Sequence, residues 1–303
     1  MTPAPPLPSP ARRRGLHAAV LAHAPGLRDL PWRATRDPWA VLVSEVMLQQ
    51  TQAGRVVGPF CRFVTRFPTP AACAAATLGE VVQAWAGLGY NRRAAQLHRA
   101  ARLVVRDHGG VVPADLDALV ALPGIGPYTA RAVLAFAYER DHGVIDTNVR
   151  RVLARAVAGA PVGGGGEQVL ADALVPAGRA WAWNQTLMEI GALVCGARVP
   201  ACDACPLARR CTWRRDRRRA VAAGACPPPD PANPVPRQSR FEGSDRQGRG
   251  RLVAALRRGP VPPTSLPAAC GWPEDAPRAG RIAARLVAEG LARRRRGGVL
   301  VLP

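Results

Sequence analysis

The sequence predicts a mainly α-helical protein in two parts, a large helical domain over residues 13–213 and a small winged-helix-like domain over residues 240–303. Apolar residues recur at helical spacing up to about residue 195, where alternating strand patterns are nearly absent. Residues 226–236 then read CPPPDPANPVP, which is the composition of a linker. Three amphipathic stretches follow, and short apolar runs on both sides of Gly297-Gly298 end the chain. This is the element order of a winged helix.

The segments outside these two domains are expected to be irregular. Residues 1–12 form a predicted disordered lead-in, and residues 214–239 form an Arg- and Pro-rich linker. No apolar run reaches the roughly 18 residues of a membrane span. The N-terminal stretch also lacks the apolar core and cleavage site of a secretory signal. We therefore expect a cytoplasmic protein with no membrane partner.

A single glutamate stands out in the first part of the chain. Asp37-Pro38 is a favourable N-cap and first-turn pair, and it opens a helix expected over 39–50. From Pro38 to Ala53 the only charged residue is Glu45. On so apolar a helix it is either buried with a partner or lines a pocket, and burial favours the protonated form that a general acid needs. The alternative is a solvent-facing Glu on an amphipathic helix.

A glycine-containing turn follows the helices expected at 52–66, 71–76, 78–86 and 92–107. Residues 122–126, Leu-Pro-Gly-Ile-Gly, lie between two helical patterns. Such a turn directs backbone N–H groups outward at a helix N-terminus, which is a ready anion site. Because glycine has no Cβ, a phosphate can come close. The alternative is an ordinary turn between two helices.

Asp146 lies where the next helix, expected to run to about Val157, should begin. The helix dipole and the free N–H groups stabilise a charged carboxylate at this position. A lone Asp here is compatible with a plain N-cap. Together, a phosphate-binding turn and an ionised Asp joined by one helix suggest chemistry on a nucleic-acid backbone.

Four cysteines give the most specific signal. They form the pattern C-x6-C-x2-C-x5-C after helices expected near 167–175 and 179–195. Four thiols in one short loop of a cytosolic protein indicate a metal site and not disulfides. Soft ligands without histidine leave zinc or an iron–sulfur cluster, and spacing alone does not separate them. The predicted ligands are Cys195, Cys202, Cys205 and Cys211.

The basic residues both suggest a partner and exclude a mechanism. The formal net charge is +21, which favours a polyanionic partner, although a composition bias toward Arg would produce the same balance. The sequence contains no lysine, so all 42 basic residues are arginines. A guanidinium cannot form a Schiff base, and every mechanism that needs a lysine nucleophile is excluded.

Taken in order, these motifs resemble the adenine-specific mismatch DNA glycosylases, the MutY family of the endonuclease III-like helix–hairpin–helix superfamily. The resemblance covers about residues 15–213. It rests on LPWR at 30–33, SEVMLQQTQ at 44–52, GLGY at 87–90, LPGIGPYTA at 122–130, IDTNVRRVL at 145–153, NQTLMEIGALVC at 184–195 and the four-cysteine loop. The MLQQT segment distinguishes this branch from its relatives.

This resemblance implies a two-lobed, all-helical fold. The protein would bind double-stranded DNA containing a mispaired adenine, and it would act as a monomer at the bacterial nucleoid. The cysteine loop (195–211) would hold a structural [4Fe–4S] cluster. Glu45 would protonate N7 of an extruded adenine, and Asp146 would stabilise the oxocarbenium-like sugar, with Asn148 and Tyr128 around that sugar. The base pocket would include Arg28, Leu30, Trp32, Arg33, Leu48 and Glu189. The DNA-binding residues would be Gln50, Thr51, Leu88 and Tyr90, which wedge into the stack beside the opposing base, and Leu122, Gly124, Ile125 and Gly126 of the hairpin.

Two positions and the C-terminal part of the chain depart from relatives of the superfamily or family. Bifunctional endonuclease III-type enzymes carry a strand-cutting lysine where this chain has Tyr128, so we expect a monofunctional glycosylase. The MutY family typically ends in a Nudix-like domain that recognises 8-oxoguanine, and residues 240–303 are too short for it. Asn91 stands where an aromatic residue is common. Recognition of 8-oxoguanine or guanine would then rest on the wedge residues.

Two other functions fit parts of this pattern. One is a monofunctional glycosylase for another mispaired base, such as thymine opposite guanine, and the QQT segment argues against it. The other is a catalytically silent iron–sulfur DNA-binding protein or redox sensor. A silent relative has no need of both Glu45 and Asp146.

Overall fold

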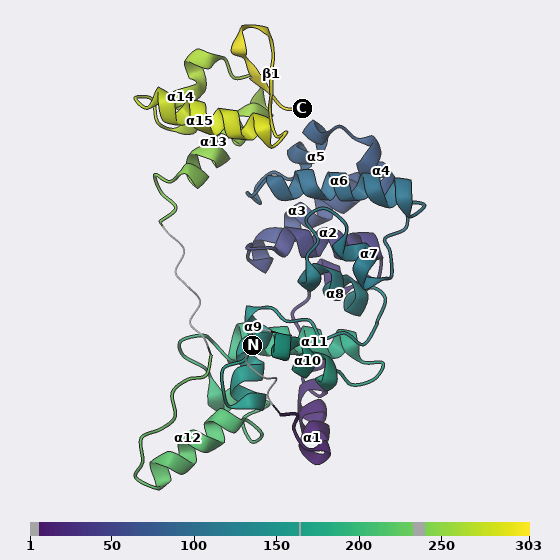
Figure 1. The fold of residues 1–303 in the computed structure, drawn as a ribbon, viewed down its shortest axis with the longest axis vertical. Helices are drawn as coiled ribbons and strands as arrows, with labels where there is room; N and C mark the ends of the chain where they lie inside the picture. Colours follow the sequence, from purple (N-terminus) through teal and green to yellow (C-terminus); the bar gives the residue numbers. More distant parts are fainter. Residues whose placement is uncertain (1–5, 164, 233–239) are drawn as a thin grey trace. The chain divides into compact units, whose positions relative to one another are not determined.

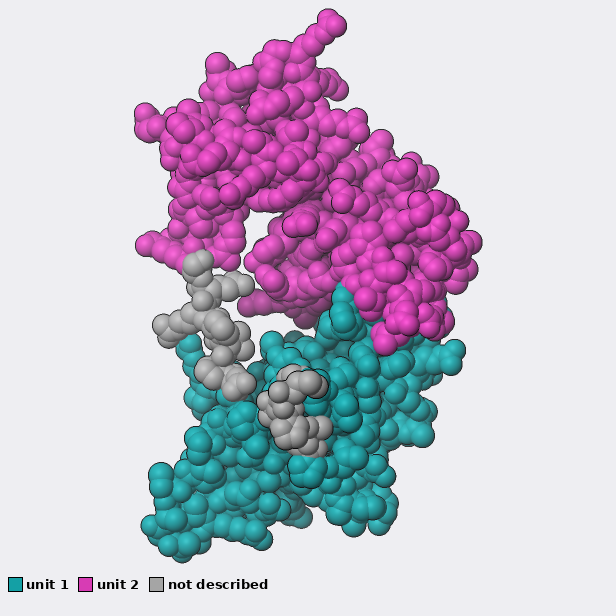
Figure 2. Space-filling model, in the orientation of Figure 1, with its two compact units in different colours: residues 1–36, 126–236 teal, residues 37–125, 237–303 magenta. Residues whose placement is uncertain are grey.

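The computed structural model describes residues 6–163, 165–232 and 240–303, and it is mainly helical. Residues 1–5 of the expected lead-in, residues 233–239 of the expected linker and Gly164 lie outside the described residues. The chain divides into two compact units, each built from two stretches of sequence (Figure 2). Unit 1 comprises residues 1–36 and 126–236, and unit 2 comprises residues 37–125 and 237–303. Among the described residues, each helix is too short or too polar to cross a membrane.

Unit 1 contains the helix that Asp146 caps and the loop that holds the four cysteines. Its helices are drawn in Figure 1. Two of its helices end in π-helical turns, which are rare and frequent at functional sites. The elements of unit 1 are α1 (Pro10–Leu21), α8 (Pro127–Phe136), α9 (Thr147–Val152) with the π turn η3 (Leu153–Ala158), α10 (Gly165–Leu174), α11 (Ala180–Glu189) with the π turn η4 (Ile190–Val194), and α12 (Thr212–Ala222), besides the 3-10 turns Ala24–Gly26, Pro31–Arg33 and Cys202–Ala204.

The core of unit 1 joins α1 to the helices of the second stretch. Leu16 and Val20 of α1 are almost completely buried in the same cluster as Val149, Leu170 and Ile190. Three of the cysteines, Cys195, Cys205 and Cys211, pack against this cluster. The cysteine loop is therefore attached to the main core of the unit, and burial of these apolar side chains stabilises it by about 25 cal/mol per Å².

Unit 2 contains the helix that carries Glu45 and the turn Gly87–Asn91. Trp85 and Phe63 meet edge to face in its core with ring centroids 5.8 Å apart, and the indole of Trp39 donates to the Phe67 carbonyl at 2.9 Å. The helices from the first stretch of unit 2 are α2 (Pro38–Leu48), α3 (Ala53–Arg66), α4 (Pro70–Ala75), α5 (Leu78–Ala84), α6 (Arg92–Asp107) and α7 (Leu116–Val120).

The second stretch of unit 2, residues 240–303, is called the C-terminal segment below. The helices and the hairpin that the sequence predicts there are present: α13 (Asp245–Arg258), α14 (Leu266–Cys270), α15 (Ala276–Ala288), β1 (Arg293–Arg294) and β2 (Leu300–Val301). The strands are antiparallel, with Arg293 opposite Val301. An isolated bridge from Val261 to Leu300 adds a third piece of sheet. The apolar interior of the C-terminal segment includes Leu252, Ile282 and Leu286.

Two expectations about the irregular segments are corrected. The Arg-rich start of the expected linker is the helix α12, because Arg is a good helix former and buried Trp213 anchors the first turn. The helix α1 begins inside the expected lead-in, since Ser9 caps it and Pro10 occupies its first turn. Arg12 donates to the carbonyls of Ala156 (2.8 Å) and Val157 (3.1 Å), which fixes this end of α1.

A glycine controls how closely α9 approaches η4. A Cβ on Gly191 would lie 2.7 Å from the Asn148 Cβ and 2.8 Å from the Asn148 carbonyl oxygen. We expect Gly191→Ala to lower the free energy of unfolding by about 1–3 kcal/mol, because the added methyl overpacks this contact. Urea unfolding measures the change. The control is Gly54→Ala in α3, where a Cβ meets nothing within 4 Å, and we expect it to be neutral or stabilising. Equal stability of the two variants would contradict the close approach.

Candidate active site

Asp146 has the geometry of an N-cap and a further contact besides. Its Oδ1 accepts the Val149 N–H at 2.7 Å at the start of α9, and its Oδ2 accepts the amide N–H of Asn148 at 2.8 Å. The carboxylate is thus oriented by the helix backbone on one oxygen and by Asn148 on the other. An anion held this way at a helix N-terminus stabilises positive charge that develops next to it.

Arg151 connects this carboxylate site to the cysteine loop, and the sequence analysis did not select it. Its Nη2 donates to the Asn148 Oδ1 at 2.8 Å, and its Nε donates to the Cys195 carbonyl at 2.6 Å. Nη2 also donates to the Gly191 carbonyl at 2.5 Å. One guanidinium therefore orients the Asn148 amide so that its N–H groups face Asp146. The signal for it was present, since Arg151 follows the DTN motif by one helical turn.

A buried charge cluster joins the start of the chain to the end of α11. Glu189 is 3% exposed and accepts from Arg28 (Nε, 2.6 Å) and Arg33 (Nη2, 2.9 Å). Burial alone would raise the pKa of Glu189, but the hydrogen bonds from the two arginines outweigh it and lower the pKa to about 2. Arg33 also donates to the Gln185 Oε1 at 2.8 Å, and Gln185 is another residue that the sequence analysis missed.

The structure brings together four of the predicted base-pocket residues in unit 1. Arg28, Arg33 and Glu189 form the cluster just described, and Trp32 is buried in the 3-10 turn that carries Arg33. Leu30 caps the start of this turn and is 8% exposed. The sixth predicted residue, Leu48, is half-buried at the end of α2 in unit 2.

Tyr128 and Gly126 lie at the start of α8. Gly126 is the N-cap, Pro127 occupies the first position and Tyr128 is half-buried at the second. The phenol of Tyr128 stands where the resemblance described above implies a lysine in bifunctional relatives.

Glu45 is buried in the middle of α2. It is 4% exposed, and apolar neighbours such as Leu42 and Val46 on the same helix are at most 2% exposed. The interpretation of Glu45 as a solvent-facing residue on an amphipathic helix is therefore wrong. Burial among apolar side chains is what the general-acid role expected for this carboxyl requires.

The predicted wedge residues occupy two turns of unusual backbone conformation. Among the described residues, positive φ outside glycine occurs at Gln50 (55°), Tyr90 (43°) and Glu139 (52°). Two of these three are predicted wedge residues, and such strain is concentrated at functional sites. Tyr90 is 43% exposed and Gln50 is exposed, whereas Leu88 is buried and Thr51 is half-buried. The first two are thus the side chains that face solvent.

One arginine binds both of these turns. The Arg93 guanidinium, which is buried, donates to the carbonyls of Met47 (2.8 Å) and Gln49 near the end of α2, and to the Thr51 hydroxyl at 3.1 Å. The same group donates to the carbonyls of Leu88 and Gly89, both at 3.4 Å. Desolvation by burial lowers the pKa of Arg93 to about 10, which still leaves it charged at neutral pH. Arg93 was not predicted from the sequence.

The predicted phosphate-binding hairpin is in the expected turn conformation. Gly124 has φ of 79°, and a Cβ there would lie 2.8 Å from the Gln96 Cβ, so a glycine is required on both counts. The Ile125 N–H donates to the Leu122 carbonyl at 3.1 Å, and both side chains are buried. Contact with DNA through this turn would therefore use its backbone.

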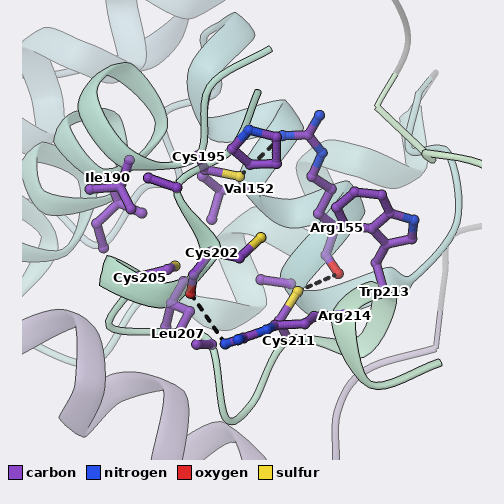
Figure 3. A pocket seen from close by; sticks show the side chains of 15 residues that line it. Val152, Arg155, Ile190, Cys195, Cys202, Cys205, Leu207, Cys211, Trp213 and Arg214 are labelled. Atoms are coloured by element: carbon purple, nitrogen blue, oxygen red, sulfur yellow. Dashed lines mark hydrogen bonds between the residues drawn. The ribbon is translucent and has the colours of Figure 1, made fainter. Parts of the chain in front are cut away.

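The four predicted cysteine ligands line one pocket with apolar walls (Figure 3). Burial raises the pKa of Cys205 to about 11 and that of Cys211 in the same direction. Among the described residues, no three His, Cys, Asp or Glu side chains are already arranged around one metal position. The donor set still fits an iron–sulfur cluster, because four cysteines line one pocket and neither His nor carboxylate lines it.

Buried Arg155 organises this cysteine pocket. It donates to the Cys195 sulfur at 3.4 Å (Figure 3). It also donates to the Gly196 carbonyl at 2.7 Å. Its side chain stacks on Trp213 and pairs with Asp230 at 2.9 Å (Nε to Oδ1). The Arg side chain thereby ties residues that follow the cysteine loop to the π turn η3.

Comparison with known proteins identifies the fold and several similar proteins. Residues 43–161 match the family model of the HhH-GPD superfamily base excision DNA repair proteins. The chain is 44% identical over 283 residues to the adenine DNA glycosylase of Mycobacterium tuberculosis, covering 91% of this chain and 89% of that one. A thermostable thymine-DNA glycosylase structure is similar with a TM-score of 0.62 and 31% identity, over 68% of this chain and 97% of that one. A non-covalent endonuclease III–DNA complex shares the fold (TM-score 0.58, 23% identity, 69% of this chain and 98% of that one).

The charge cluster around Glu189 generates a stability prediction. A pKa near 2, against 4.5 for a free glutamate, corresponds to about 3 kcal/mol of stabilisation at neutral pH. Because the folded-state pKa is lowered, this stabilisation is present above about pH 4.5 and is lost as the pH falls toward 2. We expect Glu189→Gln to lower the free energy of unfolding by about 3 kcal/mol at pH 7. The difference in the free energy of unfolding between wild type and this variant should narrow as the pH falls from 4.5 toward 2.

Urea unfolding at several pH values measures this gap. The control is Glu242→Gln, which breaks an ion pair between two largely exposed side chains and should change stability little at any pH. A gap that is the same at pH 3 and pH 7 would show that Glu189 is not held as a carboxylate by its arginines.

Proposed function

Because the chain belongs to the adenine DNA glycosylases, which hydrolyse N-glycosyl bonds in base excision repair, we propose that it excises adenine mispaired with 8-oxoguanine or guanine and leaves the strand intact. It would act as a monomer on double-stranded DNA in the cytoplasm. The observation that carries this proposal is the carboxylate of Asp146, oriented on both oxygens at the start of α9.

The proposed reaction divides the work between two carboxyl groups. The adenine leaves the base stack and enters a pocket, at a cost of a few kcal/mol. Neutral adenine is a poor leaving group, so the buried carboxyl of Glu45 donates its proton to N7. The bond between C1′ and N9 then breaks, and its electron pair leaves with the adenine.

Asp146 and water complete the reaction. The ionised carboxylate stabilises the positive charge on the sugar, or bonds to C1′ transiently, as in a retaining glycosidase. Glu45, now ionised, accepts a proton from water, and the oxygen of that water bonds to C1′. The amide of Asn148, oriented by Arg151, keeps Asp146 in place and polarises the sugar site.

The remaining predicted residues would supply recognition. The cluster of Arg28, Arg33 and Glu189, with Leu30, Trp32 and Leu48, would line the base pocket. Exposed Tyr90 and Gln50 would enter the stack beside the opposing base, where an aromatic ring can replace lost stacking. Thr51 and Leu88 would support them, and the hairpin turn would bind phosphate.

Cys195, Cys202, Cys205 and Cys211 would hold a [4Fe–4S] cluster. When bound, this group supplies structural cross-linking of the loop and a surface for DNA, and it takes no part in bond cleavage. The guanidinium of Arg155 beside the Cys195 sulfur would favour that residue as a thiolate ligand.

Substitution of Asp146 tests the chemical role directly. Asn serves nearly as well as Asp as an N-cap, so Asp146→Asn should fold and bind DNA normally. We expect single-turnover adenine release to fall on the order of 10³-fold, because the variant has lost the charge that stabilises the sugar cation. The loss should persist at saturating enzyme. Activity close to wild type would reduce Asp146 to a cap.

A single-turnover assay on a set of duplexes tests the substrate and the absence of strand cutting. Adenine is placed opposite 8-oxoguanine, guanine or thymine, and a further duplex carries thymine opposite guanine. We expect fastest adenine release opposite 8-oxoguanine, with strand breaks visible only after alkali, since Tyr128 and the rest of the chain offer no lysine amine. Borohydride trapping of an enzyme–DNA adduct would contradict this, and release of thymine would favour the other mismatch glycosylases.

A further inference from the structure

The C-terminal segment packs on the turn Gly87–Asn91 within unit 2, which gives it a place in the enzyme that its sequence did not suggest. The last turn of α13 and the end of α5 exchange hydrogen bonds. Arg257 donates to the Val82 carbonyl through Nε (3.1 Å) and Nη2 (3.0 Å). In return the Gln83 side-chain amide donates to the Arg257 carbonyl at 3.0 Å. A cation that binds the last carbonyls of a helix is well placed, because the helix dipole is negative there.

The third hydrogen bond of Arg257 reaches the turn itself. Its Nη2 donates to the Oδ1 of Asn91 at 2.7 Å. Asn91 is 4% exposed and directly follows Tyr90, and its side chain makes no capping hydrogen bond to α6. The amide of Asn91 is thus held from the C-terminal segment, at the position where relatives commonly carry an aromatic residue.

Two other observations support the same docking. A Cβ added to Gly79 would overlap the carbonyl oxygen of Pro303, so Pro303 packs directly on the backbone of α5. The pKa of Glu289 is lowered mainly by the hydrogen bonds that Glu289 accepts from Arg249. The charge of Arg92, the residue after Asn91, lowers it further. The segment therefore meets α5 and α6 on both sides of the turn.

We propose that Arg257 is a positioning residue, through which the C-terminal segment holds the turn that presents Tyr90 to DNA. Tyr90 has φ of 43°, a strained conformation for a residue with a side chain, and it is flanked by Gly89 and Asn91. Arg93 holds the carbonyls of the turn from inside unit 2, and Arg257 holds the adjacent amide from the C-terminal segment. Loss of either allows Tyr90 to leave this conformation.

This inference rests on the proposed function, in which Tyr90 wedges beside the opposing base. It therefore assigns the C-terminal segment to mismatch discrimination and not to bond cleavage. Removal of Arg257 should weaken binding to mispaired duplexes and leave base release at saturating enzyme nearly unchanged.

The experiment measures binding and single-turnover kinetics on the full chain. Binding uses a duplex with a 2′-fluorinated adenosine, which resists cleavage because the fluorine destabilises the sugar cation, opposite 8-oxoguanine or thymine. We expect Arg257→Ala to raise the Kd for the 8-oxoguanine duplex about tenfold, as for loss of one charge-assisted hydrogen bond. The Kd for the thymine duplex should change less than about threefold, so that discrimination falls.

Two further variants separate positioning from charge and from packing. Arg258→Ala removes the same charge at the next, exposed residue and should match wild type. Asn91→Ala tests the contact from the other side and should reproduce Arg257→Ala, while the double variant should be no worse than either single one. If Arg257→Ala fails to fold, comparing the Kd of Asn91→Ala with that of Arg258→Ala still tests the positioning role.

The outcomes are distinguishable from failure of the proposed function. The positioning role would be overturned if Arg257→Ala and Asn91→Ala bound the mispaired duplex as tightly as Arg258→Ala does. It would also be overturned if the effects of Arg257→Ala and Asn91→Ala on the Kd were additive in the double variant. Equal weakening on the mispaired and paired duplexes would show a general DNA contact instead. Wild-type protein that releases no adenine contradicts the proposed function, while the binding comparison still tests Arg257.

Discussion

A buried guanidinium needs protein acceptors for its N–H donors in place of water, and the arrangement of the functional residues depends on where these acceptors come from. The two terminal nitrogens of Arg93 donate to backbone carbonyls and the Thr51 hydroxyl of two turns that lie about 40 residues apart in the sequence, while its Nε has no hydrogen-bond partner among the described residues. The cost of burying its charge is offset only when these carbonyls converge. The two turns are therefore fixed relative to each other, including the strained residues Gln50 and Tyr90.

The same physical device recurs in unit 1. Arg151 joins the Asn148 amide to the backbone of the cysteine loop, and Arg155 joins the π turn η3 to the same loop and to Asp230. In a chain without lysine, each of these connections uses a planar group whose donors reach several acceptors at once. The carboxylate of Asp146 is thereby linked through hydrogen bonds to the cysteine loop.

Electrostatic environments separate the roles of the carboxyl groups. Glu45 lies on an apolar helix, Asp146 accepts two hydrogen bonds at a helix N-terminus, and Glu189 is held as an anion between two arginines. Three carboxyl side chains in one protein thus have different surroundings, as the different roles proposed for them require. The C-terminal segment also contributes to these surroundings, because its Arg257 donates to Asn91, the residue next to exposed Tyr90.

The sequence by itself determined the helical class and the bounds of most helices, because periodicity and caps are local properties. Its motif spacings also selected the residues that we propose carry the chemistry. Glu45 was recognised as unusual because its helix has no other charge, and the four cysteines because of their spacing. The domain boundaries at 213 and 240 stay a prediction, and the helix α12 was missed because a run of arginines resembles a solvated linker. Tertiary structure alone revealed Arg93, Arg151 and Arg257, since an arginine looks the same in the sequence whether it faces water or binds remote carbonyls. Which segments supply those carbonyls is decided by packing between distant parts of the chain.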